Sequence, residues 1–247
     1  LEKINSILDI DSKNYDALRD KSYIYLLKND YIGAKKYIEN ILSLKEDDYF
    51  GYNIKGLIYL KNNFFNEAKN LFDLAIKIND RYVDSYNNLG SCLLELEKLD
   101  EAKKVFNSAY NIEKKNVSTL INLANVLSLQ DNIKEAEKYY NEALNLDPNN
   151  PEILSNLAIC YCRGSNEKEA KIYYNKALKL NPYDYKLMYA YCVLQLKLNN
   201  FNKSWELFDS RLLIEKNKEK LNNFNLVKNN LFNNLKINPK DKLLVLR

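Results

Sequence analysis

Histidine is absent from this 247-residue chain, and glycine and proline number only five and four. Without histidine, the most frequent general base and a common nitrogen ligand for metals are both missing. The chain also has no glycine-rich phosphate loop, no metal-ligand cluster and no nucleophile motif. We therefore expect no catalytic residue, no metal site and no cofactor within residues 1–247.

The scarcity of glycine and proline also limits the number of sharp turns, so most residues should lie in long helices joined by short polar loops. A composition of 46% hydrophobic and 28% charged residues is typical of globular proteins. No apolar run reaches the length of a membrane span, so we expect no membrane insertion. The 37 basic and 33 acidic residues are interspersed, which argues against nucleic acid as a partner.

The four cysteines all fall in apolar stretches with helical spacing. A C-x-C pair on a helix directs its two thiols about 200° apart, so it suits neither one metal nor one disulfide. We interpret the cysteines as small core residues in a reducing compartment, which predicts a cytoplasmic protein. The four residues are Cys92, Cys160, Cys162 and Cys192.

A period of 34 residues continues along most of the chain without insertion or deletion. A fixed period in this size range is typical of repeat architectures. Positions within each block are numbered from 1 to 34, with Val83 at position 1. The predicted blocks are 15–48, 49–82, 83–116, 117–150, 151–184 and 185–218.

Positions 8 and 20 of the blocks carry only small residues. Small side chains at both positions allow two antiparallel helices to approach closely. Position 8 is Ser22, Gly56, Gly90, Ala124, Ala158 and Cys192, and position 20 is Ala34, Ala68, Ala102, Ala136, Ala170 and Ser204.

Large residues recur at position 24, and the spacing of apolar residues within a block is that of two amphipathic helices. Pro148 and Pro182 at position 32 and Pro151 at position 1 mark block boundaries, where a missing N–H costs little. These features predict an all-α fold. Position 24 is Ile38, Phe72, Phe106, Tyr140, Tyr174 and Phe208.

The combined pattern resembles the tetratricopeptide repeat, over residues 1 to about 218. The resemblance implies a right-handed superhelical solenoid of antiparallel helix pairs. It also implies that the first helix of each pair lines a concave groove, which usually holds an extended peptide or a partner protein. The residues that carry it are Leu-Gly or Leu-Ala at 89–90, 123–124 and 157–158, the position-20 alanines, the position-24 aromatics, Ala75, Ala109, Ala143 and Ala177 at position 27, and the position-32 prolines.

Three residues depart from the pattern. Lys21 stands at position 7, Gln195 at position 11 and Glu167 at position 17, where the other blocks mostly carry apolar residues. These departures weaken single blocks without changing the predicted register.

Both ends of the chain are expected to belong to larger units. Residues 1–14 occupy positions 21–34, so they are predicted to be the second helix of a truncated upstream repeat. Residues 219–247 are mostly polar and end in the apolar run Leu243–Leu246, which has the character of a short buried strand. Two interpretations stay open. The run is either part of a frayed tail or a strand added to something else, or it is the first strand of a downstream domain.

The last block suggests what such a downstream domain would be. Arg211 at position 27 would be a buried unpaired charge if another repeat followed. The motif "FNKSWELFDSR", with Phe201, Trp205, Phe208 and Arg211, resembles the junction between repeats and catalytic domain in bacterial glycosyltransferases similar to O-linked N-acetylglucosamine transferase. This resemblance implies a nucleotide-sugar site beyond Arg247, so no catalytic residue is assigned to this chain.

Position 6 faces the concave groove in the repeat family. It carries Asn88, Asn122 and Asn156 in three consecutive blocks, and Asn87 and Asn125 could widen the same polar strip. A row of amides can pair with both the N–H and C=O groups of an extended peptide. The alternative is that asparagine at position 6 reflects a general preference of such repeats.

These observations favour a protein–protein interaction module that binds a peptide or partner protein. It would be the N-terminal recognition arm of a larger protein, with the glycosyltransferase as one possibility for the parent chain. The alternative is a stand-alone scaffold or co-chaperone-like adaptor without an enzymatic domain.

Overall fold

The computed structural model describes residues 2–208, and these residues form α-helices joined by short turns, without a strand among them. The predicted all-α fold of consecutive helix pairs is therefore confirmed. The strand predicted at 243–246, the segment 219–247 and Arg211 lie outside the described residues. The helices are α1 Glu2–Ile10, α2 Tyr15–Leu27, α3 Tyr31–Leu44, α4 Tyr49–Lys61, α5 Phe65–Ile78, α6 Val83–Glu95, α7 Leu99–Ile112, α8 Val117–Leu129, α9 Ile133–Leu146, α10 Pro151–Arg163, α11 Glu167–Leu180, α12 Tyr185–Lys197 and α13 Phe201–Phe208.

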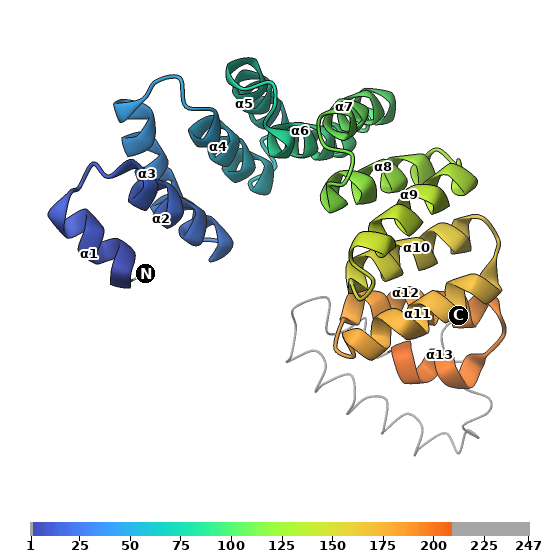
Figure 1. The fold of residues 1–247 in the computed structure, drawn as a ribbon. Helices are drawn as coiled ribbons and strands as arrows, with labels where there is room; N and C mark the ends of the chain where they lie inside the picture. The colour runs from blue at the N-terminus through green and yellow to red at the C-terminus, as the bar shows by residue number, and fades with distance from the viewer. Residues whose placement is uncertain (1, 209–247) are drawn as a thin grey trace. The chain divides into compact units, whose positions relative to one another are not determined.

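The chain divides into two compact units, residues 1–146 and 147–247, which are described separately (Figure 1). In the first unit α1 packs on α2, and the pairs α2–α3, α4–α5, α6–α7 and α8–α9 each form a helix hairpin. In the described part of the second unit the hairpins are α10–α11 and α12–α13. Each first helix begins at position 1 of its 34-residue block.

Most first helices begin at a capping side chain. The residue before position 1 is an asparagine or aspartate in five of the six blocks, and its side-chain oxygen accepts a hydrogen bond from a backbone N–H in the first turn. Such a cap satisfies a donor that has no partner within the helix. The exception is Tyr82 before α6. The caps are Asn14, Asp48, Asn116, Asn150 and Asp184.

The first helices end in one repeated turn. Position 15 adopts a left-handed backbone conformation with φ between 56° and 63° in all six blocks. The N–H of position 16 then donates to the carbonyl oxygen of position 11, which is the hydrogen bond of a Schellman cap. No glycine occupies this position. The residues are Asn29, Asn63, Glu97, Asp131, Ser165 and Asn199.

Glu97 should therefore carry backbone strain that glycine would relieve. We expect Glu97→Gly to raise the free energy of unfolding by about 0.5–1 kcal/mol, because the left-handed conformation costs a residue with a Cβ about 1–2 kcal/mol and the greater freedom of glycine in the unfolded chain offsets part of the gain. Urea unfolding measures the change. The matched control Glu95→Gly, at the last residue of α6, should lower the free energy of unfolding by up to about 1 kcal/mol. A change of the same sign in both variants would contradict the prediction.

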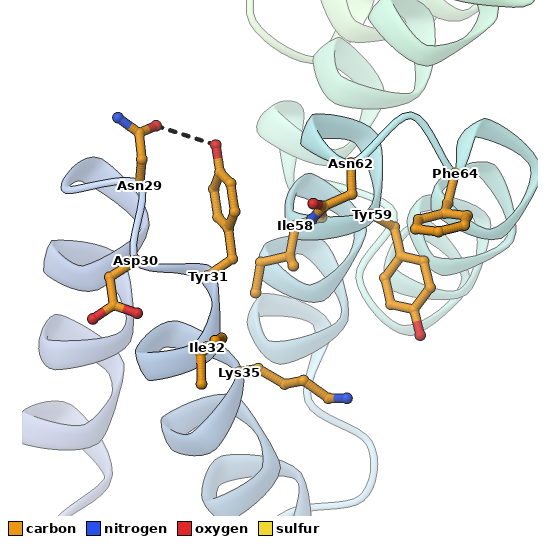
Figure 2. Close-up of a pocket in the computed structure, with 9 residues that line it drawn as sticks. All are labelled: Asn29, Asp30, Tyr31, Ile32, Lys35, Ile58, Tyr59, Asn62 and Phe64. Atoms are coloured by element: carbon orange, nitrogen blue, oxygen red, sulfur yellow. Dashed lines mark hydrogen bonds between the residues drawn. The ribbon is translucent and has the colours of Figure 1, made fainter.

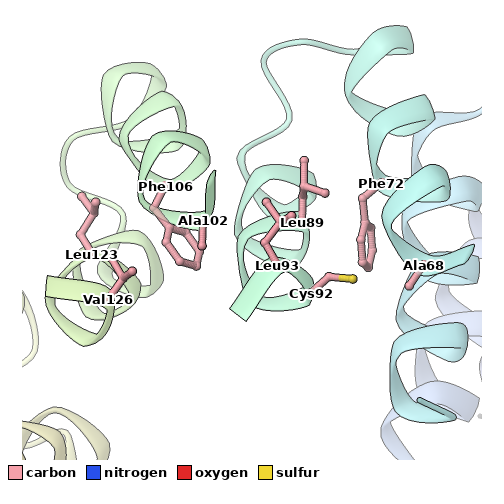
Figure 3. Packing of buried hydrophobic residues seen from close by; sticks show 9 residues of the cluster. All are labelled: Ala68, Phe72, Leu89, Cys92, Leu93, Ala102, Phe106, Leu123 and Val126. Carbon is pink, nitrogen blue, oxygen red and sulfur yellow. The ribbon is translucent and has the colours of Figure 1, made fainter. Parts of the chain in front are cut away.

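The core repeats with the blocks, and positions 8 and 24 pack directly against each other. Phe106 is fully buried, and a Cβ placed on Gly90 would lie 2.3 Å from a ring carbon of Phe106. Gly56 stands in the same relation to Phe72, at 2.5 Å. Figure 3 shows both rings in a cluster formed by α5, α6, α7 and α8. In these two blocks the glycine at position 8 therefore leaves room for the ring at position 24.

The three departures from the repeat pattern have local partners. The Lys21 ammonium lies 4.7 Å from the ring centroid of Tyr37. Glu167 forms an ion pair with Lys197 at 2.7 Å in the second unit, and this partner lowers the pKa of Glu167. Gln195 is fully buried, and its amide oxygen accepts a hydrogen bond from the Asn200 amide at 2.9 Å.

None of the helices among residues 2–208 is long and apolar enough to span a bilayer.

Candidate functional site

The first helices of the first unit line one groove of about 280 Å³. Among the described residues, its lining comes from α2, α4, α6 and α8 and from Tyr82, while no second helix contributes. The lining includes Asn87, Asn88 and Asn122, three of the residues predicted from the sequence. We call it the first-helix groove; its lining is Tyr23, Phe50, Asn53, Ile54, Leu57, Tyr82, Asp84, Asn87, Asn88, Ser91, Ser118 and Asn122.

Asn88 is held by a buried amide on the preceding first helix. The Asn88 amide nitrogen donates to the Asn53 side-chain oxygen at 3.0 Å. The Ser85 hydroxyl donates to the same oxygen at 3.2 Å. Because Asn53 is only 2% exposed, its oxygen depends on these donors for its hydrogen bonds. The contacts join α4 to α6 and fix the plane of the Asn88 amide.

The same arrangement recurs one block later, between α6 and α8. The Asn122 amide nitrogen donates to the Asn87 side-chain oxygen at 3.3 Å. The Asn87 amide nitrogen donates to the Thr119 hydroxyl at 3.0 Å. Asn87 is buried, and its side-chain oxygen accepts the hydrogen bond from Asn122. It therefore does not widen the strip of exposed amides, as the sequence had suggested.

Asn53, Ser85 and Thr119 form hydrogen bonds with the groove asparagines or with each other's partners, and the sequence prediction did not include them. The signal was available, because asparagine occupies position 5 in two consecutive blocks and a hydroxyl residue occupies position 3 of the block that follows each one. We refer to these two sets of contacts as the amide network. Its components are Asn53, Ser85 and Asn88, and then Asn87, Thr119 and Asn122.

The other two predicted residues lie elsewhere. The Asn125 side-chain oxygen accepts a hydrogen bond of 2.5 Å from the Tyr140 hydroxyl, within the α8–α9 hairpin, and Asn125 is not part of the groove lining. Asn156 lies half-buried on α10 in the second unit. The structure therefore brings Asn87, Asn88 and Asn122 together.

The electrostatics of the first-helix groove depend on a small number of groups. Asp84 is the one charged side chain in its described lining. Burial, together with the nearby Asp84 carboxylate, raises the pKa of Tyr82, so the phenol stays protonated at physiological pH. At the edge, the Arg19 guanidinium lies 4.8 Å from the centroid of the Phe50 ring.

A second cavity of about 760 Å³ lies between the α2–α3 turn and the end of α4 (Figure 2). Two of its lining residues, Ile32 and Phe64, are 87% and 55% exposed. Phe64 occupies the N-cap of α5 without a side-chain cap, although the equivalent residue is polar in every other block. The sequence prediction missed this cavity, even though an apolar residue at this capping position was a usable signal.

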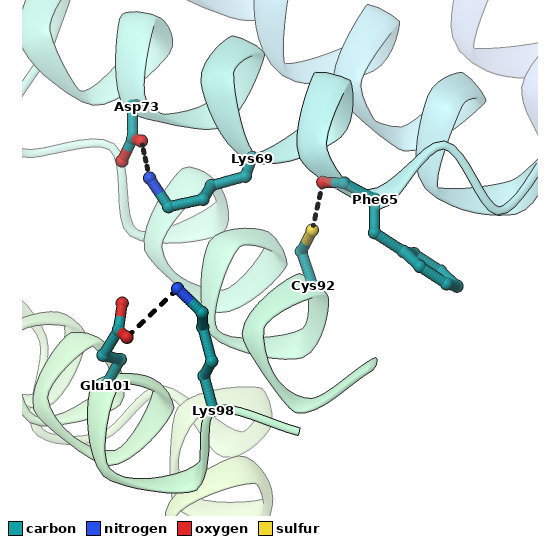
Figure 4. Close-up of polar contacts among 6 residues, drawn as sticks. All are labelled: Phe65, Lys69, Asp73, Cys92, Lys98 and Glu101. Carbon is teal, nitrogen blue, oxygen red and sulfur yellow. Dashed lines mark hydrogen bonds and ion pairs between the residues drawn. The ribbon is translucent and has the colours of Figure 1, made fainter. Parts of the chain in front are cut away.

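Two ion pairs and one buried thiol lie outside the linings of both cavities. Lys69 pairs with Asp73 at 2.7 Å and Lys98 with Glu101 at 3.2 Å, and both pairs are partly exposed to solvent (Figure 4). Exposed pairs of this kind contribute little to stability. The Cys92 thiol donates to the Phe65 carbonyl oxygen at 3.1 Å, and burial raises the pKa of this thiol, which makes it a poor nucleophile.

Comparison with known protein families agrees with this architecture. Family models for the tetratricopeptide repeat match residues 51–82, 83–116 and 116–182, more than half of the chain. The chain belongs to the tetratricopeptide repeat family. Its helix hairpins are the repeats of that family, and the first-helix groove lies on the helices that come first in each repeat. A search of curated proteins found no match.

Several solved structures have a similar fold. A thermophilic protein of this family from Thermus thermophilus is 22% identical, with a TM-score of 0.65 over 74% of this chain and 99% of that one. The pilus biogenesis factor PilW is 18% identical, with a TM-score of 0.73 over 86% and 98%. YrrB, described as having an unusual peptide-binding site, is 18% identical, with a TM-score of 0.53 over 74% and 94%. At these identities the similarity shows the fold alone.

Proposed function

We propose that this tetratricopeptide repeat chain binds an extended segment of a partner protein in the first-helix groove. The observation that carries the proposal is the amide network, which orients Asn88 and Asn122 in the lining of a single groove. Each of the two amides uses one N–H in the network and retains a second N–H and its carbonyl oxygen. A ligand backbone could therefore receive one donor and one acceptor from each repeat.

The amide network also supports the alternative that asparagine at position 6 is a general preference of these repeats. Because Asn88 and Asn122 join neighbouring repeats, asparagine at this position has a stacking role whether or not a ligand is bound. The two roles are compatible, since a fixed amide loses less entropy when it binds a ligand. We propose Asn156, at the same position of its repeat, as the continuation of the row, and Asn125 as a peripheral residue.

Replacing Asn88, Asn122 and Asn156 together by alanine should weaken peptide binding about tenfold or more, because each lost hydrogen bond is worth about 0.5–1.5 kcal/mol. An array of short peptides of varied sequence identifies binders of the wild-type chain. Fluorescence anisotropy with labelled copies of those peptides then measures the affinity of the variant, and circular dichroism reports whether the helices remain.

The control exchanges Asn70 and Asn141, which are exposed on the second helices α5 and α9, for alanine. This variant should bind the same peptides with unchanged affinity. Equal affinity of the triple variant and the wild type would contradict the role of the amide row. A wild-type chain that enriches no peptide over a glycine–serine control would contradict peptide binding itself.

We also propose that the chain is the recognition arm of a larger protein. It is supported by the likeness of the motif from Phe201 to Arg211 to the repeat-to-catalytic-domain junction of the glycosyltransferases, although the Trp205 and Phe208 side chains and Arg211 lie outside the described residues. Reading the parent gene past Arg247 tests it: an α/β domain should follow, and a stop codon would leave a stand-alone scaffold or adaptor. The free cysteines support a cytoplasmic location.

A further inference from the structure

We propose that the first-helix groove selects partner segments that carry an arginine or lysine side chain, with the cation placed near Asp84. This inference rests on the proposed function and adds the chemical class of the ligand. It is carried by the charge of the groove, by the hydrogen-bond acceptors in its lining and by its aromatic wall.

The charge of the groove is opposite to that of the protein. The whole chain has a formal net charge of +4. The lining of the groove comes mostly from positions 2, 5, 6 and 9 of the repeats. In the first four repeats these positions contain three aspartates, one arginine and no lysine. Of the charged residues at these positions, Asp84 lines the groove, whereas Asp16, Arg19 and Asp20 lie outside its described lining.

The lining of the first-helix groove offers hydrogen-bond acceptors in addition to the Asp84 carboxylate. The amide network uses one N–H of Asn88 and one of Asn122, while no described residue donates to either carbonyl oxygen. The Ser91 hydroxyl donates its proton to the Asn87 backbone carbonyl at 2.9 Å, which leaves the Ser91 oxygen as an acceptor. A guanidinium or an ammonium group offers several donors and no acceptor, so it matches this lining better than a carboxylate does.

The aromatic wall of the groove accepts a cation within the protein itself. The Arg19 guanidinium lies 4.8 Å from the Phe50 ring centroid, a distance at which the ring face attracts a positive charge. Tyr23, which is 47% exposed, lines the same groove and can cover the methylene stem of a ligand side chain. Arg19 is exposed, so it would compete with an incoming cation or move away from it.

The test uses one peptide that binds the wild-type chain, synthesised in versions that differ at a single residue. The versions carry arginine, citrulline, which keeps the shape without the charge, or glutamate. Isothermal titration with the whole chain should show the arginine version binding about three- to tenfold tighter than the citrulline version. The glutamate version should bind most weakly, and raising the salt concentration should reduce these differences.

Three variants locate the effect. Asp84→Asn should remove the preference for arginine over citrulline, and Arg19→Gln should increase it because a competing cation is lost. Glu67→Gln is the matched control, because it removes the same charge from the second helix α5 and should change nothing. Equal affinities for arginine and citrulline would overturn this inference and leave the proposed function intact. If the wild-type chain bound none of the peptides in the array, this inference and the proposed function would both be overturned.

Discussion

Replacement of Phe106 by alanine is expected to lower the free energy of unfolding by about 3–5 kcal/mol. The ring is fully buried, and it packs with Leu89, Leu93 and Leu123 from the two neighbouring first helices (Figure 3). Truncation would leave a cavity in the core that joins α6, α7 and α8. Urea unfolding followed by circular dichroism measures the loss.

Gly90 provides a second test of this packing. Its backbone lies close to the Phe106 ring, so the effects of replacing the two residues should depend on each other. Gly90→Ala alone should cost about 1–3 kcal/mol, since the new methyl group would overlap a ring that has no free space to enter. In the Phe106→Ala background the same exchange should be neutral or stabilising by up to about 1 kcal/mol, because the clash is gone and alanine favours the helix. Additive effects of the two exchanges would contradict direct packing of position 8 on position 24.

Replacement of Asn87 by alanine is expected to lower the free energy of unfolding by about 1–3 kcal/mol. The exchange deprives the Thr119 hydroxyl and the Asn122 amide of a shared partner in a buried part of the α6–α8 interface. Thermal and urea unfolding measure the change. Because Asn122 would lose its fixed orientation, affinity for a groove peptide should fall in the same variant.

A matched exchange separates the amide network from a general effect of removing an asparagine. Asn141→Ala on α9 removes an exposed amide and should change stability by less than about 0.5 kcal/mol. Thr119→Val should resemble Asn87→Ala, and the double variant should cost less than the sum of the two, because they share one interaction. If Asn87→Ala changed the free energy of unfolding as little as Asn141→Ala, the amide network would not contribute to stability.

The fold could be predicted almost entirely from the spacing of residues. Small residues at positions 8 and 20 and large residues at position 24 recur in every block, and this periodicity is sufficient to predict helix hairpins and their register. Hydrophobic periodicity determines which face of a helix is buried, so it can be read without coordinates. The handedness of the superhelix and the residues after 208 stay predictions.

The candidate site could be predicted only in part. Counting positions placed Asn88 and Asn122 on the groove, because all position-6 residues share one face of the first helix. Counting could not show that Asn87 is buried or that Asn125 bonds to Tyr140, because both facts depend on which side chains of other helices are within hydrogen-bond distance.

By itself, the sequence determined the repeat family, the helix pairs and the absence of histidine chemistry, because these depend on residue type and on short-range spacing. The tertiary structure decided the geometry of three other features: the hydrogen bonds of the amide network, the left-handed residue that ends each first helix, and the cavity beside Phe64. Hydrogen-bond partners from different repeats are more than 30 residues apart in the chain, and only the packing of helices brings them within 3.3 Å. Local spacing contains no measure of that distance.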